Sequence, residues 1–295
     1  MDVFEITGNS TGVSRAGVNF LQPSDSYQNL ENGFIYRQVL QSRQGIGYFA
    51  PRLAGNTRVF LIFEYIKPDD TKELLVFDQN FLYKFDIGTA AFVQVPFAGS
   101  MAAYAGFNIP LKFQYISATA YPDKANNGRV IFTGEGIAAN AAGSAVFFYD
   151  GTEVKDFTNV TDNPDYAPPI NGPLNRAVFV IAFGERLNFV APTVNSVTFN
   201  QGFQYSGIRN SAGNGDKFNA PGSGIIQGDT AEAIYGVSIL GQVVVLNFFR
   251  SNWTIEKTTD AFNPYFIRKI PSVLGTNAKF SAVSWSDTIK SIGKT

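Results

Sequence analysis

The chain has 295 residues, with 23 Lys and Arg against 24 Asp and Glu and a formal net charge of -1. This balance gives the chain no overall attraction to nucleic acid or to an anionic membrane. It contains neither Cys nor His, which excludes disulfides, thiolate nucleophiles, Cys-ligated metal centres and every Ser-His-Asp arrangement. Any catalysis would have to use carboxylate, Lys or Tyr side chains.

The aromatic content indicates an all-β protein. The chain holds 28 Phe, 13 Tyr and 28 Gly, and 45% of its residues are hydrophobic, enough for a sizeable core. Residues Met1 to Glu5 lack the basic and then apolar pattern of a secretory signal. Because no run reaches about 18 apolar residues, we expect a chain without a membrane span that is made in the cytoplasm and stays soluble.

Residues 1–57 are predicted to form an N-terminal arm followed by a lead-in hairpin. Residues 1 to 33 are polar and carry little strand pattern, whereas Phe34 to Tyr48 alternates and ends in Gly-Ile-Gly. The hairpin would present Arg37 and Arg43 on a polar face. These two arginines fit contact with phosphate or a partner, but a solvated strand face is favoured.

Residues 58–97 predict the first sheet. Four short apolar or alternating runs are separated by polar turn residues, which is typical of antiparallel strands joined by hairpins. The expected strands are Arg58 to Ile66, Lys72 to Phe77, Phe81 to Ile87 and Ala91 to Phe97. Because a single meander needs a neighbour to bury its faces, we expect further sheets, tolerance of charge changes in Lys67 to Thr71, and a large cost for Phe77→Ala.

A second sheet is predicted after a loop or one short helix at Ala98 to Pro110. Its strands are expected at Leu111 to Tyr121, Arg129 to Thr133, Ala145 to Asp150 and on to Asn159, with a loop at Gly134 to Ser144.

A short sequence pattern that occurs twice, here called the echo, links these two sheets. An aromatic strand that ends in Asp86 and runs into Gly88-Thr89 resembles a second one that ends in Asp150 and runs into Gly151-Thr152. The spacing is 150 − 86 = 64 residues, longer than the roughly 40 to 50 residues of compact propeller repeats. The echo therefore predicts repeated sheets with inserted loops.

A proline-rich exposed connection at Thr161 to Pro173 leads to the third and fourth sheets. In this connection, Asp162 and Asp165 are weighed as calcium ligands, and a turn role is favoured. The third sheet is expected from Ala177 to Ile208, and a long loop from Arg209 to Gly224 lacks a Walker lysine. The fourth is expected within Ile225 to Thr258, followed by a polar and aromatic stretch to Ile270.

The sequence therefore predicts an all-β fold: a β-propeller-like series of antiparallel meander blades, incomplete in this chain. We expect about four blades in residues 58–295, the last one incomplete, since Lys279 to Ile292 begins another strand pair. This end predicts a fragment or cleavage product. The residues indicate no catalytic, cofactor-binding or metal-ligating site and no cofactor.

The order of motifs resembles the β-propeller tail nozzle or packaged-DNA stabilisation proteins of short-tailed bacteriophages, also described as tail hub or tubular proteins. The resemblance covers roughly residues 25 to 290 and consists of short patterns that each mark a blade. These patterns are Leu30 to Phe34, Leu40 to Ile46, Leu74 to Phe85, Val95 to Phe97, Gly184 to Phe189, Phe203 to Ile208 and Ile234 to Trp253.

The resemblance implies a non-enzymatic virion protein that forms a homo-oligomeric ring, six-fold in well-known members, below the portal and adaptor. Its partners would be other tail, portal and adaptor proteins, and its lumen would hold and then release DNA without binding it tightly. The chain departs from the family at its C-terminus, where the remaining blades are missing.

A second hypothesis is a receptor- or glycan-binding β protein of the phage tail, with or without carboxylate-based glycosidase activity. It rests on the aromatic and Gly-rich loops and on Asp69, Asp70, Glu135 and Asp216. A glycosidase needs two carboxyl groups about 5 to 9.5 Å apart on either side of a cleft. An intracellular scaffold is a third, less favoured, interpretation.

Overall fold

The computed structural model describes residues 33–36, 39–42, 50–53, 58–110, 115–271, 275–276, 283–285 and 288–290. The chain divides into two compact units, Met1–Pro51 and Arg52–Thr295. In the first, β1 (Gly33–Tyr36) and β2 (Val39–Ser42) pair as an antiparallel hairpin, as the sequence predicts. Arg37 and Arg43 lie outside the described residues, and the predicted boundary between 57 and 58 stays a prediction.

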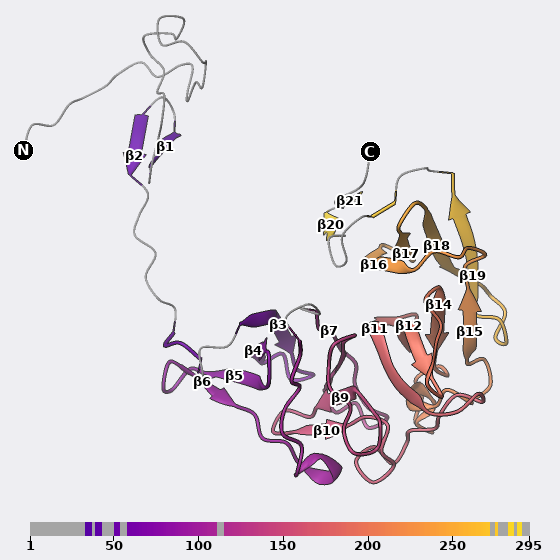
Figure 1. The fold of residues 1–295 in the computed structure, drawn as a ribbon, viewed down its shortest axis with the longest axis horizontal. Helices are drawn as coiled ribbons and strands as arrows, with labels where there is room; N and C mark the ends of the chain where they lie inside the picture. The colour runs from indigo at the N-terminus through magenta and orange to yellow at the C-terminus, as the bar shows by residue number, and fades with distance from the viewer. Residues whose placement is uncertain are drawn as a thin grey trace, which may run out of the picture. The chain divides into compact units, whose positions relative to one another are not determined.

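The second unit contains four antiparallel sheets that follow one another along the chain (Figure 1). In the first two, strand order follows chain order. The first sheet consists of β3 (Val59–Ile66), β4 (Lys72–Asp78), β5 (Leu82–Asp86) and β6 (Ala91–Gln94). The second consists of β7 (Ser117–Ala120), β8 (Val130–Thr133), β9 (Val146–Tyr149) and β10 (Val154–Asp156).

The third and fourth sheets are also meanders. The third consists of β11 (Leu174–Phe183), β12 (Arg186–Val194), β14 (Gly202–Tyr205) and β15 (Gly224–Gln227), with the short β13 (Val197–Thr198) paired to β12. The fourth consists of β16 (Ile234–Leu240), β17 (Val243–Phe248), β18 (Asn252–Lys257) and β19 (Tyr265–Ile270). A separate hairpin pairs β20 (Val283–Trp285) with β21 (Thr288–Lys290), and β20 contacts β16.

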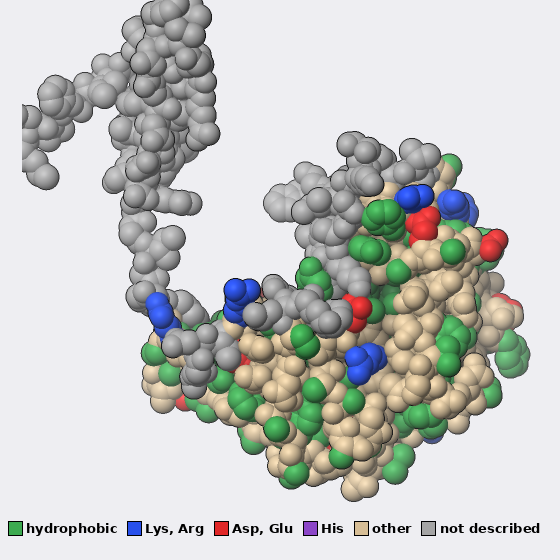
Figure 2. All heavy atoms as spheres, in the orientation of Figure 1, with side chains coloured by type: hydrophobic (Ala, Val, Ile, Leu, Met, Phe, Trp, Pro, Cys, Tyr) green, Lys and Arg blue, Asp and Glu red, His purple; other side chains and the backbone are tan. Residues whose placement is uncertain are grey.

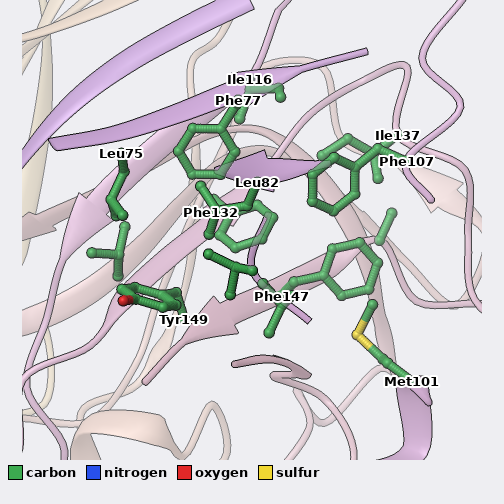
Figure 3. Packing of buried hydrophobic residues seen from close by; sticks show 14 of the residues in the cluster. Leu75, Phe77, Leu82, Met101, Phe107, Ile116, Phe132, Ile137, Phe147 and Tyr149 are labelled. Atoms are coloured by element: carbon green, nitrogen blue, oxygen red, sulfur yellow. The ribbon is translucent and has the colours of Figure 1, made fainter. Parts of the chain in front are cut away.

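Successive sheets pack face to face through shared apolar clusters. The first cluster joins sheets one and two, and Figure 3 shows Phe77 and Leu82 of the first sheet against Phe132 and Phe147 of the second. The rings of Phe77 and Phe132 meet edge-on with centroids 4.9 Å apart, a favourable aromatic geometry. A second cluster joins sheets two and three, and a third joins sheets three and four.

Double-sided burial explains the unbroken apolar runs of the second sheet. In β8, Phe132 belongs to the first cluster while its neighbour Ile131 belongs to the second. In β9, Phe147 and Phe148 divide in the same way. Alternate side chains of a strand point to opposite faces of its sheet, so a strand covered on both faces carries hydrophobic residues at every position.

The all-β class and the propeller-like series are thus confirmed, and the propeller is not closed. Among the described residues, each apolar cluster joins one sheet to the next along the chain, and no cluster joins the fourth sheet to the first. The loop at Ala98 to Pro110 contains one short 3-10 helix, η3 (Gly99–Met101), as predicted.

Three predicted segments differ from the structure. Residues 225 to 227 lie in β15 and complete the third sheet rather than opening the fourth. The stretch after Asp260 contains β19, the outer strand of the fourth sheet, where the sequence predicts no strand. The strand expected from Leu111 begins only at Ser117 in the described residues, which omit 111–114.

Candidate functional site

The carboxylates of the β3–β4 turn are turn residues. Asp69 Oδ1 accepts hydrogen bonds from the backbone N–H of Thr71 at 3.0 Å and from its hydroxyl at 2.6 Å. The hydroxyl and then the N–H of Thr71 lower the pKa of Asp69. Asp70 follows in the left-handed region with φ of 62°, which Asp tolerates better than most residues. Both residues lie in the turn that the sequence predicts between the first two strands.

Asp162 and Asp165 also have structural partners. The Asp162 carboxylate accepts a hydrogen bond from the backbone N–H of Ser100 at 3.2 Å and one from its hydroxyl. This contact ties η3 to the loop after β10. Asp165 pairs with Lys124 at 2.8 Å. Among the residues that the structure describes, no group of three acidic side chains could hold a metal ion.

Asp216 forms a buried ion pair that joins the second and third sheets. It lies in the 3-10 helix η4 (Asn214–Asp216), and its Oδ1 is 2.5 Å from Nη2 of Arg129. The guanidinium lies 5.8 Å from the ring centroid of Phe148 and 5.6 Å from that of Phe157, within cation–π range. This carboxylate therefore neutralises a buried cation, a role that the sequence does not reveal.

The four carboxylates proposed for a glycosidase lie in three separate segments of the chain. Asp69 and Asp70 lie in the β3–β4 turn, Glu135 follows β8, and Asp216 lies in η4 between β14 and β15. Glu135 uses its backbone carbonyl to accept a hydrogen bond from Arg176. None of the four lines any of three well-formed pockets in the described part of the chain.

A cleft of about 620 Å³ lies beside the first and second sheets. Its apolar lining comes mostly from β5, β6 and the residues that directly follow them, and Tyr149 enters it from the second sheet. The lining residues are Thr71, Lys72, Glu73, Lys84, Phe85, Asp86, Ile87, Val93, Gln94, Val95, Pro96, Tyr149, Gly151 and Thr152.

Glu73 is the central charge of this cleft. It is 8% exposed and lies 2.7 Å from Nζ of Lys67 and 2.6 Å from Nζ of Lys84. The hydroxyl of Tyr149 donates to its Oε2 at 3.0 Å, and Figure 3 shows that hydroxyl at the edge of the apolar packing. Three donors thus hold one carboxylate between two sheets.

The electrostatics of the cleft favour a fixed charge over proton transfer. Burial opposes ionisation of Glu73, but the hydrogen bonds from Lys67, Lys84 and Tyr149 outweigh it and lower its pKa. The pKa of Asp86 is also lowered, first by the N–H of Gly88. General acid catalysis at neutral pH needs a carboxyl whose pKa is raised. Both carboxylates of this cleft have the opposite shift.

The comparisons with known proteins give a fold likeness and no family. No family model matches the chain, and no curated protein matches it. Among the described residues, no helix is long and apolar enough to cross a membrane. The class that the fold defines is therefore an all-β protein with a propeller-like series of sheets, and no particular family can be added to it.

The solved structures that are similar to this chain include β-propeller proteins whose descriptions name different kinds of protein. The extracellular domain of a proposed one component system from B. thetaiotaomicron is 12% identical over 82% of this chain and 33% of its own, with a TM-score of 0.39. The Dos1 propeller is 10% identical over 77% and 50%, with a TM-score of 0.39. YCF48 from Cyanidioschyzon merolae is 10% identical over 87% and 72%, with a TM-score of 0.44.

The chain spans about one third of the length of the first of these structures. None of the three is a phage tail protein by its description. The likeness carries no argument about binding or activity, so function has to be argued from the residues themselves.

Proposed function

We propose that this protein is a structural, non-enzymatic component of a short bacteriophage tail, of the nozzle or hub type. In this role it forms part of a homo-oligomeric ring in the virion, contacts other tail, portal and adaptor proteins, and surrounds a conduit that seals and then releases packaged DNA. Support comes from the order of the blade-forming motifs over residues 25 to 290 and from the series of meander sheets.

The observation that carries the proposal is that key ionisable side chains join one sheet to the next. Glu73 of the first sheet receives the hydroxyl of Tyr149 from the second, and Arg129 of the second pairs with Asp216 of the third. Buried charges that are paired in this way stiffen an arrangement and are costly to separate. Carboxylates that are used in this way suit a structural protein better than a hydrolase.

The surface charge suits a wall that DNA passes without being held. The net charge is -1, and the face in Figure 2 shows a few basic and acidic side chains, mixed in sign, among uncharged ones. Tight non-specific binding to duplex DNA needs several cations aligned along the phosphate backbone. A sparse, mixed surface lets the duplex slide.

The outer strand face of the first sheet supplies a surface for a protein neighbour. Ile62 and Ile66 of β3 are 64% and 51% exposed and alternate with Tyr65 and other residues that face the first cluster. Exposed apolar side chains on one face of a sheet favour contact with another protein. We assign this face to the neighbouring copy in the ring.

Electron microscopy and sedimentation of the purified chain, alone and with the other tail proteins of the particle, test the proposal. We expect rings or a defined complex, and we expect Ile62→Glu to abolish them while leaving the monomer folded. Ile87→Glu is the matched control, because Ile87 is 83% exposed outside this face. A chain that stays monomeric and joins no tail component rules the proposal out.

A further inference from the structure

Arg186 is a buried cation without an acidic partner. It begins β12 and is 5% exposed. Its Nη1 donates to the carbonyl oxygens of Ser206 at 2.6 Å and Gly222 at 2.8 Å. Among the described residues, Arg186 joins no ion pair, and Nε and Nη2 make no hydrogen bond. Burying a charge without a counter-ion is costly, and an anion that reached these two donors would neutralise it.

The surroundings of Arg186 are aromatic. The ionisable side chains that interact with it electrostatically are the phenol groups of Tyr265, Tyr205 and Tyr121. Burial is the main cause that lowers the pKa of Arg186, yet a guanidinium remains protonated at neutral pH. Tyr265 donates its own proton to the carbonyl of Phe183 at 2.7 Å. The phenols therefore give shape to the site and leave the positive charge unneutralised.

Arg186 lines a pocket of about 310 Å³ formed by two hairpins. One is the β11–β12 turn at Gly184 and Glu185, and the other is the β18–β19 connection from 257 to 264. A Cβ on Gly184 would lie 2.9 Å from Cε of Lys257, and Gly184 itself has φ of 65°. The hairpins approach this closely because glycine stands at their contact.

Gly222 lies close to the other side of the guanidinium. A Cβ at this position would lie 2.3 Å from the carbonyl oxygen of Ala261 and 3.3 Å from Nη2 of Arg186, and the residue has φ of 71°. The backbone conformation and the close contact both require glycine here. Glycine thus lets the backbone at 222 pack against Ala261 beside Nη2.

The pocket has a buried cation at its base and carboxylates on its rim. Lys257 adds a second cation, whose Nζ lies 5.2 Å from the Phe183 ring centroid and joins no ion pair among the described residues. Glu185 and Asp260 are exposed on the rim. The Asp260 carboxylate already accepts hydrogen bonds from Phe262 and Asn263. Two cations and two carboxylates make the pocket neutral overall, with a cation at its base.

We propose that this pocket binds an acidic sugar residue through its carboxylate. The free Nε and Nη2 of Arg186 form the planar fork that matches a carboxylate with two parallel hydrogen bonds. Thr259 and Asp260 at the rim meet sugar hydroxyls. A doubly charged phosphate is disfavoured because the rim carboxylates repel its second charge. The volume is at the small end of ligand pockets, which suits one monosaccharide residue.

The inference does not depend on the tail assignment, because it concerns a pocket and not an assembly surface. Isothermal titration of the full chain, in a buffer free of carboxylates and phosphate, compares glucuronate with glucose, acetate and inorganic phosphate. We expect glucuronate to bind at least about tenfold more tightly than glucose, which lacks the charge. Acetate should bind more weakly than glucuronate, because it offers the carboxylate without the hydroxyls.

Two variants test whether the ligand binds in this pocket. Arg186→Lys should weaken glucuronate binding by roughly tenfold or more, since an ammonium lacks the fork. If that variant fails to fold, Lys257→Gln at the exposed second cation should still weaken binding by about threefold to tenfold. Lys72→Gln, in the first sheet, is the matched control and should bind as the parent does.

The result that overturns the proposal is equal binding of glucuronate and glucose, or no binding of either. Tighter binding of phosphate than of glucuronate also overturns it, since it would make the site a phosphate site. Equal binding of acetate and glucuronate also overturns the proposal, because it would show that the site recognises a small carboxylate and not a sugar. Loss of glucuronate binding in the Lys72 control would place the ligand elsewhere.

Discussion

At the scale of single residues, the β3–β4 turn contains two kinds of charge that look alike in the sequence. Asp69 and Asp70 cap a solvent-facing turn, whereas Lys67 reaches Glu73 at 2.7 Å. The expectation that all charges from Lys67 to Thr71 tolerate reversal is therefore too broad. The reason is that Glu73 lies on the buried face, and its partner Lys67 is only 28% exposed.

Reversal of Lys67 should destabilise the fold, and reversal of Asp69 should not. Lys67→Glu places a second carboxylate beside Glu73 and should cost roughly 1 to 3 kcal/mol of unfolding free energy. Asp69→Lys should leave the melting temperature nearly unchanged, because both Thr71 bonds lie in an exposed turn. Thermal unfolding of the two variants measures the difference, and equal melting temperatures would contradict it.

The Arg129–Asp216 pair gives a second prediction at the same scale. Asp216→Asn leaves the guanidinium of Arg129 buried without a counter-charge and should cost about 3 to 5 kcal/mol. Asp165→Asn is the matched control, because its partner Lys124 is 46% exposed and remains hydrated. Urea unfolding of both variants provides the test. A loss for Asp216→Asn no larger than that for the control would show that the buried pair does not hold the sheets together.

The lowered pKa values of Glu73 and Asp150 make stability depend on pH. Burial opposes ionisation of each, and hydrogen bonds from lysines and neighbouring donors reverse the shift. A pKa lowered by folding adds stability that is complete above the unfolded value, about 4. That stability is lost as the pH falls through the folded value. The melting temperature should therefore drop in acid, and the difference between the parent and Glu73→Gln should shrink as the pH falls below about 4.

At the scale of elements, the sequence predicts the repeated corner of the sheets. The strand ending in Asp86 is β5, the third strand of the first sheet, and the strand ending before Asp150 is β9, the third of the second sheet. Asp86 accepts the N–H of Gly88, and Asp150 accepts the N–H of Thr152. The echo marks equivalent positions because the same short-range bonds form the same turn in both sheets.

Elements with weak local patterns escape prediction. The segment Gly224–Gln227 is short and follows a glycine-rich loop, yet its pairing with β14 makes it a strand. In the same way, Tyr265–Ile270 is charged on its outer positions and becomes a strand by pairing with β18. Outer strands of a sheet are half solvated, so their composition resembles that of loops. Their identity depends on long-range partners.

The candidate sites depend even more on distant residues. Glu73 and Tyr149 are 76 residues apart, and Arg129 and Asp216 are 87 residues apart. Nothing local distinguishes Asp216, which forms an ion pair, from Asp70, which occupies a turn. For Arg186, the absence of an acidic partner becomes visible only when two hairpins of different sheets are placed together. Residue types can suggest such groups, but the fold decides their partners.

Phe77→Ala tests the packing between the first two sheets. The side chain is fully buried and meets Phe132 across the sheet interface, so the fold agrees with the inward orientation assumed from the sequence. Truncation should cost about 3 to 5 kcal/mol through lost burial and a cavity. Ile62→Ala, on the exposed face of the same sheet, is the control. A cost for Phe77→Ala as small as for the control would show that this interface is loosely packed.

At the scale of the whole molecule, the three apolar clusters link the sheets in sequence. A substitution in one cluster should therefore destabilise the two sheets that share that cluster before the others. Phe77→Ala disturbs the cluster between sheets one and two and leaves the cluster between sheets three and four untouched. Local opening should therefore increase most in β4 and β8. Hydrogen exchange should show faster exchange there than in β17. Uniform acceleration in all four sheets would mean that the unit opens only as a whole.

The proposed role in a DNA conduit also predicts how tightly the chain binds duplex DNA. A net charge of -1 with dispersed cations offers few positions for releasing the counterions of DNA. Duplex DNA should therefore bind the full chain more weakly than about 10⁻⁴ M at physiological salt, the weak end of non-specific binding. Its affinity should also change little with salt concentration, since the slope counts the phosphates that are neutralised. Fluorescence anisotropy of a labelled duplex across salt concentrations measures both. Tight binding with a steep salt slope would reveal an aligned basic groove, and a DNA-gripping protein would then replace the passive wall proposed here.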